Sequence, residues 1–210
     1  MLYGFTLFEL FKLGGIFMWP LLLFSVIGVA FIIERSYIFL KSDLKPNNTI
    51  PKMFDNLKTK DVKKAKESLE NSKKNHISDV LKTGLDMIEQ DIGRMEKSME
   101  AATTIKVKKL EKGLNVFVVL SNIAPLTGFL GTVSGMINAF KSIATAEEVS
   151  TQLVAIGIYE ALITTVAGLI IAIVVVSAYN IFIHKIDNFI SDTERFSNEM
   201  IETLIEQKIK

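Results

Sequence analysis

The sequence has 210 residues, of which 49% are hydrophobic and 22% charged, and its mean hydropathy is +0.34. Long stretches hold almost no charge while others are dense in lysine, which is typical of a membrane protein with aqueous segments and argues against a soluble domain. The net charge of +1 gives no bulk attraction to nucleic acid, and the lack of cysteine in this chain excludes disulfides, thiolate metal sites and cysteine nucleophiles.

The chain begins with a short apolar segment, residues 1–15. It carries Glu9 and Lys12 and ends in Gly14 and Gly15. This pattern predicts an amphipathic helix that lies in the membrane interface on the outer side. The alternative is that the segment simply extends the first membrane span.

Three apolar runs predict transmembrane helices at 16–40, 116–140 and 153–183. A bilayer core needs about 20 apolar residues, so each run is long enough to cross it. The second run contains no ionisable residue, and the third contains only Glu160 as an acid. The third run has 31 residues, more than one bilayer thickness, so we expect it to tilt or to project into water.

The distribution of basic residues predicts the orientation of the spans. Residues 41–115 contain 17 Lys and Arg against 12 acids, and the tail 184–210 contains four more basic residues. The turn 141–152 contains only one. Because cytoplasmic loops carry the excess of Lys and Arg, the N-terminus and this turn face outward, and the large loop and C-terminus are cytoplasmic.

The cytoplasmic segments read as helices. Pro and Asn residues predict a connector over 36–51, residues 61–71 a short helix, and Ser78 the N-cap of the next. Apolar residues at helical spacing predict one long helix over 92–140, and the third span continues in the same way through Leu204. The predicted fold is an all-α membrane protein whose second and third spans extend into a cytoplasmic helical bundle at 41–115 and 184–210.

Glu160 is the candidate functional residue. An acid at the centre of a membrane helix costs about 2.5–3.5 kcal/mol on insertion scales, so such residues are rare and mark ion or proton pathways. A carboxyl group that holds and releases a proton within the membrane suits a proton relay. The open alternatives are a structural polar contact between helices and an interfacial glutamate in outer water.

Hydroxyl and small residues extend this candidate site. Thr164 and Thr165 follow Glu160 by about one helical turn, and Thr132 on the second span offers a further hydroxyl. Pro125 predicts a kink in the second span. Small residues on the second and third spans, among them the i+4 pairs Gly131/Gly135 and Gly157/Ala161, predict close helix packing, without saying whether the neighbour is in the same subunit. The residues are Gly128, Gly131, Gly135, Gly157, Ala161 and Gly168.

No other pattern indicates chemistry. The sequence shows no phosphate loop, metal-ligand spacing or nucleophile triad, so we expect neither an enzyme nor a bound metal or cofactor. His76 and His184 are isolated and read as surface residues.

Two runs carry a family resemblance. APLTGFLGTVSGMINAF at 124–140 resembles the second span of the MotA/TolQ/ExbB proton-channel family. GIYEALITTVAGLIIAI at 157–173, followed by AYN, resembles the third span, and the opening at 14–39 is most similar to the ExbB branch. The family often has a proline where this chain has Val174.

The resemblance implies a multi-pass protein of the bacterial inner membrane, working as a pentameric ring with a small single-span ExbD/TolR-like partner that carries a membrane aspartate. It implies that Glu160, Thr165 and Thr132 match the family's proton-pathway positions, and that proton influx drives TonB-dependent outer-membrane transport through a TonB-like protein. Two alternatives stay open: a TolQ-like role in the Tol-Pal envelope system, and a passive membrane scaffold.

Overall fold

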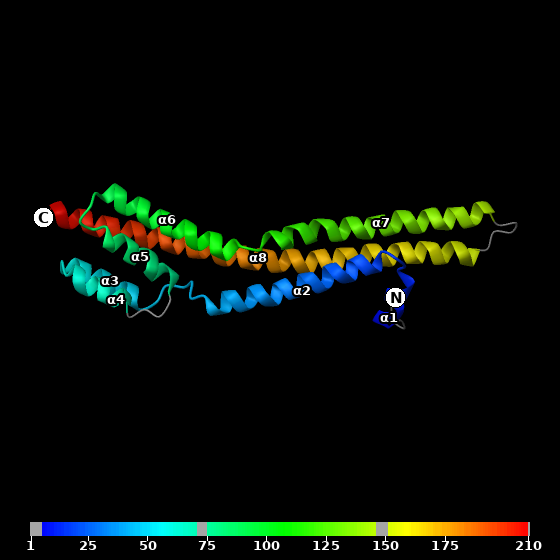
Figure 1. Cartoon of the computed structure of the whole chain (residues 1–210), viewed down its shortest axis with the longest axis horizontal. Helices are drawn as coiled ribbons and strands as arrows, with labels where there is room; N and C mark the ends of the chain where they lie inside the picture. The colour runs from blue at the N-terminus through cyan, green and yellow to red at the C-terminus, as the bar shows by residue number, and fades with distance from the viewer. Residues whose placement is uncertain (1–5, 71–74, 146–150, 210) are drawn as a thin grey trace. The chain divides into compact units, whose positions relative to one another are not determined.

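The structure is a computed structural model that describes residues 6–70, 75–145 and 151–209 (Figure 1). These residues form eight α-helices and no β-strand; the one extended pairing is an isolated bridge between Asp43 and Asn75. In chain order the helices are α1 (Leu7–Leu13), α2 (Met18–Lys41), α3 (Thr49–Lys58), α4 (Val62–Glu70), α5 (His76–Asp86), α6 (Ile92–Glu111), α7 (Asn115–Thr145) and α8 (Thr151–Ile209).

The prediction of an all-α chain with three membrane spans is confirmed. Helical stretches long and apolar enough to cross a bilayer lie in α2, in the stretch Ile92–Thr145 and in Val154–Glu206. Large apolar side chains stay exposed along all three, as lipid-facing helices require: Leu22, Val26, Ile33, Leu126, Phe129, Ile137, Leu162, Leu169 and Ile173. The orientation of the spans stays a prediction.

The chain divides into two compact units, and the first holds the candidate site. It comprises Met1–Glu34 and Gly113–Asn180, within the described residues. Here α7 runs beside α8, and α2 packs against both (Figure 1). A Cβ atom on Gly28 of α2 would meet Val175 of α8 at 3.0 Å and Leu120 of α7 at 3.7 Å. Small residues thus bring three helices together.

The second unit comprises Arg35–Lys112 and Ile181–Lys210, again within the described residues. Its core is built from the apolar stripes of α3 to α6 and the C-terminal part of α8. The side chains that are buried to 1% exposure or less include Ile50, Met53, Leu57, Ile77, Leu81, Leu85, Met99, Ile186, Phe189 and Met200. A helical bundle was predicted for these segments; its cytoplasmic location stays a prediction.

The α8 helix runs without a break over 59 residues, so the prediction that the third span continues through Leu204 is confirmed. Apolar positions on α8 recur at helical spacing in both units, which keeps one face of the helix in each core. The helix passes through Val174 with its backbone intact.

The prediction of one helix over 92–140 is wrong, because the backbone breaks between α6 and α7. Lys112 leaves the helical region with φ −53° and ψ 120°, and Gly113 takes a left-handed φ of +86°. Glycine reaches this conformation without steric cost and commonly ends helices. The apolar stripe continues across the break, which is why periodicity alone did not reveal it.

Helix starts in the second unit also differ from prediction. Asn75, not Ser78, caps α5: its side-chain oxygen accepts from the Ser78 backbone N–H at 3.0 Å. The predicted connector 36–51 is shorter, because α2 runs to Lys41 and α3 already begins at Thr49 with Pro51 in its first turn. Proline is tolerated there because first-turn N–H groups have no helical partner.

Helices in the first unit extend beyond their predicted bounds. The turn predicted at 141–152 is helical up to Thr145 and again from Thr151, and residues 146–150 lie outside the described residues. α1 is a helix separate from α2, with Gly14 at its C-cap. Residues 1–5 lie outside the described part, and the interfacial position of α1 stays a prediction.

Candidate functional site

Glu160 lies on α8 within the first unit, and its side chain is half-buried. Its carboxyl group fills the space beside Gly15, where an added Cβ atom would overlap Oε1 and lie 2.9 Å from Cδ. Gly15 has a φ of +66°, a region that side chains disfavour. The carboxyl group therefore lies against bare backbone of the turn that leads into α2.

The turn at Gly14 and Gly15 is held in place from both sides. Thr6 and Glu9 form a reciprocal capping box at the start of α1, and the Gly14 N–H donates to Leu10 O at 3.0 Å. The rings of Phe11 and Trp19 meet edge-on with centroids 5.2 Å apart, which ties α1 to α2.

The start of α2 gives this surrounding a polar character. The Met18 N–H reaches Gly15 O at 3.3 Å, and the following N–H groups belong to the first turn of α2. The N-terminal turn of a helix carries partial positive charge. The Glu160 carboxyl group thus lies close to backbone dipoles.

A threonine cluster joins α7 to α8. Thr132 and Thr165 have their hydroxyl groups in direct contact. Together with Thr164 they converge on one acceptor, the Gly128 carbonyl oxygen, at 3.3, 3.1 and 3.2 Å. Thr164 is 1% exposed and donates also to Ala161 O at 2.8 Å. The three hydroxyl groups therefore form a compact polar patch in an otherwise apolar helix contact.

The cluster is compact because small residues let the two backbones approach. A Cβ atom on Gly128 would lie 2.7 Å from Thr164 O, and one on Gly168 would lie 2.5 Å from Ala124 O. On Gly135 it would lie 2.9 Å from the Ala161 Cβ atom. The structure thus brings the predicted packing residues together within one chain, with Gly131 against Thr164 and Gly157 against Ala139.

Glu160 and the threonine cluster are near but separate. Thr165 lies five residues further along α8, roughly 7.5 Å at 1.5 Å per residue. Within the described residues no hydrogen bond joins the Glu160 carboxyl group to Thr132, Thr164 or Thr165. A proton passing between them needs a bridging water molecule or a side-chain movement.

The predicted kink residue lies inside α7, which continues through it. Pro125 lacks an N–H group, so the Ser121 carbonyl loses its helical donor. The neighbouring Ala124 carbonyl is the one that packs against Gly168.

Two residues matter more than the sequence indicated. From the sequence, Gly15 was predicted only to end the first apolar segment. Arg35 follows the uncharged part of the first span, yet it is 7% exposed, and its Nη1 donates to the Lys112 carbonyl at the break before Gly113. A lysine-rich last helical turn followed by glycine is the signal that could have revealed this helix end.

His76 is half-buried in the second unit, not on the surface, whereas His184 is exposed as expected. The His76 ring meets Phe189 edge-on at 6.1 Å, and its Nδ1 lies 3.4 Å from Lys106 Nζ. Burial, and then the nearby Lys106 charge, lower the pKa of His76. Lys106 also pairs with Asp79 at 2.7 Å.

Comparison with known proteins agrees with these features. The family model described as the MotA/TolQ/ExbB proton channel family matches residues 72–195, which include all of α5, α6 and α7 and the part of α8 that carries Glu160. The Tol-Pal system protein TolQ of Haemophilus influenzae is 30% identical over 200 residues, 89% of this chain and 86% of that protein.

Two further relatives are named after ExbB. The biopolymer transport protein ExbB-like 1 of Synechocystis sp. is 29% identical over 183 residues, 84% of this chain and 70% of that protein. An ExbB homolog of Methanothermobacter thermautotrophicus is 24% identical over 190 residues, 90% of this chain and 67% of that protein. The similarity thus covers both units.

Proposed function

Because the chain belongs to the MotA/TolQ/ExbB proton channel family, we propose that it is the proton-channel subunit of an energy-transducing motor in a bacterial inner membrane. It is a multi-pass membrane protein of a family of channel and transport-associated proteins. In this proposal it acts as ExbB-like proteins do, coupling proton influx to TonB-dependent transport across the outer membrane.

One observation carries the proposal: the one acid in the apolar run 153–183 of α8 lies against backbone, about one helical turn from a cluster of hydroxyl groups in a helix contact. The Glu160 carboxyl group is enclosed on one side by Gly15, and Thr132, Thr164 and Thr165 occupy the α7–α8 contact deeper in the span. An intramembrane carboxyl group with polar neighbours on the bundle side marks a proton pathway.

Protons would pass from the outer side by way of an aspartate of the partner, Glu160 and the threonine cluster to the cytoplasm. Each charge that crosses 100 mV releases about 2.3 kcal/mol. Each unit of pH difference adds about 1.4 kcal/mol. In this proposal several protons cross for each mechanical step.

The proposed assembly is a homo-oligomer, a ring of five chains, around a single-span ExbD/TolR-like protein, with a TonB-like protein as the recipient of the motion. The exposed apolar faces of α2, α7 and α8 leave surface for lipid and for such neighbours.

Two alternative functions stay open: the same kind of motor with other partners, and a protein that conducts no protons. The TolQ relative supports a role in the Tol-Pal envelope system, and a neighbouring gene for a Pal-like lipoprotein in place of a TonB-like protein would favour it.

The second alternative is a passive scaffold, in which Glu160 only fixes the helix register. The test is siderophore-dependent uptake in cells that produce the chain with its partner. We expect Glu160→Gln and Glu160→Ala to abolish uptake while the complex still assembles. Glu199→Gln, at an exposed position further along α8, is the matched control and retains uptake. Normal uptake with Glu160→Gln would leave the scaffold as the better description.

A further inference from the structure

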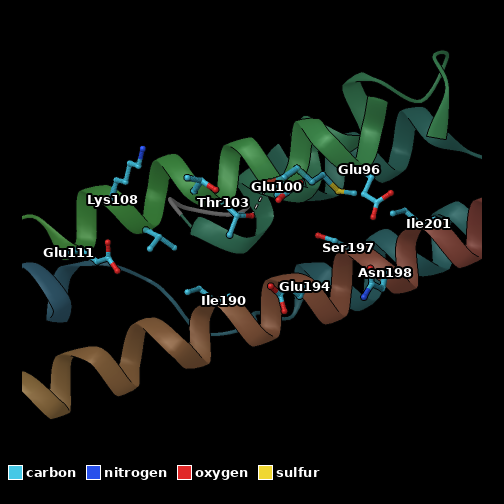
Figure 2. A pocket seen from close by; sticks show the side chains of 13 residues that line it. Glu96, Glu100, Thr103, Lys108, Glu111, Ile190, Glu194, Ser197, Asn198 and Ile201 are labelled. Atoms are coloured by element: carbon cyan, nitrogen blue, oxygen red, sulfur yellow. Dashed lines mark hydrogen bonds between the residues drawn. The ribbon is translucent and has the colours of Figure 1, made fainter. Parts of the chain in front are cut away.

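A groove runs between α6 and the C-terminal part of α8 in the second unit (Figure 2). Its volume is about 520 Å³. We call it the α6–α8 groove. Its lining includes Met99, Thr104 and Val107 on α6 and Ile190 and Ile201 on α8.

The groove is long and has an apolar floor. On α6 its lining follows one stripe of the helix from Glu96 to Glu111, a length of about 22 Å at 1.5 Å per residue. Val107, Ile190 and Ile201 are partly exposed within it. These dimensions match one side of a helix of about 15 residues.

The rim of the groove is acidic on both walls. Glu96, Glu100 and Glu111 line the α6 wall and Glu194 the α8 wall, against a single base, Lys108. Figure 2 shows Glu96 and Glu111 between the two helices, whereas Lys108 extends away from the gap. All four carboxylates are exposed.

The four rim carboxylates are not neutralised by ion pairs. In the described part of the chain none of the four forms an ion pair, as is also true of other exposed acids such as Glu67 and Glu199, whereas five acids of the unit have a basic partner within 3.1 Å. The paired acids are Asp61, Glu70, Asp79, Asp86 and Asp192. The groove thus concentrates uncompensated negative charge around apolar surface.

The spacing of the four rim carboxylates indicates which class of ligand fits the groove. Within the described residues no three acidic or histidine side chains converge as a metal site. The rim therefore presents separate charges along its length rather than one cage for a cation. Anions, including acidic lipid headgroups, are repelled by this rim.

We propose that the α6–α8 groove binds a basic amphipathic helix of a partner protein. The apolar side of that helix lies on Val107, Ile190 and Ile201, and its Lys or Arg side chains reach the four rim carboxylates. This is the helix-in-groove mode of recognition, in which apolar anchors at i, i+3, i+4 and i+7 give affinity. The rim charges give steering and orientation.

The test uses the full chain, purified in a nonionic detergent, and a fluorescent 15-residue peptide of Leu and Lys with one apolar face. We expect the Leu/Lys peptide to bind, the same peptide with Glu in place of Lys not to bind, and added salt to weaken binding by screening. Glu100→Gln with Glu194→Gln should weaken binding about tenfold. The matched control, Glu67→Gln with Glu199→Gln, removes two exposed acids outside the groove and leaves affinity unchanged.

A second measurement tests whether another copy of this chain covers the groove instead. Because the chain has no cysteine, Thr104→Cys in the groove and Ser191→Cys on an exposed face of α8 can each be labelled with a maleimide. We expect both to react in the absence of peptide, and the peptide to protect only Thr104→Cys. The proposal is overturned if the double Gln variant of the groove binds the peptide as tightly as the control double variant does. It is also overturned if the maleimide fails to label Thr104→Cys before any peptide is added.

Discussion

Replacing Gly15 tests the most specific contact in the candidate site. Gly15→Ala has two separate effects. A Cβ atom would occupy the position of Glu160 Oε1 and lie 2.9 Å from Cδ, so the carboxyl group has to move. The left-handed φ of +66° adds a backbone cost of roughly 1–2 kcal/mol for a residue with a side chain.

Two variants separate these effects. Gly15→Asn adds the same Cβ atom, but asparagine tolerates the left-handed region. Gly14→Ala, at a φ of −83°, would mainly meet the flexible Met18 side chain, with Cγ at 2.5 Å, and serves as the neighbouring control. If the contact with Glu160 matters, both Gly15 variants lose function and Gly14→Ala keeps it.

The assay is proton uptake into vesicles from cells that produce the chain with its partner, followed with a pH-sensitive dye. Displacing the carboxyl group need raise the barrier to proton transfer by only about 1.4 kcal/mol to slow uptake tenfold, and we expect at least that loss. Glu160→Asp is one methylene shorter and should partly restore uptake to Gly15→Asn. Uptake at the original rate in Gly15→Asn, with the complex assembled, would refute the reasoning.

Three further predictions concern other contacts. Thr165→Val keeps the shape but removes a hydroxyl that bonds Gly128 O at 3.1 Å; we expect assembly without proton conduction in the vesicle assay, and normal conduction would contradict this. Gly128→Val places side-chain atoms against the Thr164 carbonyl. Such overpacking typically lowers the free energy of unfolding by about 1–3 kcal/mol, so we expect a lower melting temperature in detergent. Leu130→Val on the exposed face is the control and should melt at the temperature of the original chain. Because burial lowers the pKa of His76, the folded second unit favours the neutral ring, so stability falls as pH drops through about 6.5, the unfolded value. His76→Gln should flatten that pH dependence of thermal unfolding, and an unchanged slope would show that other groups cause it.

The spans and the candidate acid could be predicted from the sequence because they depend on composition. An uncharged run of about 20 residues has few alternatives to a membrane helix, since backbone groups in lipid must bond within the segment. One acid in such a run stands out for the same reason. The small residues of the second and third spans likewise indicated close packing, without identifying the neighbouring helix.

Sequence by itself thus determined the all-α class, the three spans, the long α8 and the interest of Glu160. Only the tertiary structure decided that Gly128 and Gly168 pack α7 on α8 in the same chain, that Glu160 faces Gly15, and that α6 and α7 break at Gly113. Hydrophobic periodicity reports which side of a helix is apolar. It does not report which backbone approaches that side, or where a backbone torsion turns the chain. The close approach of Gly15 and its φ of +66° are the two facts that place the Glu160 carboxyl group.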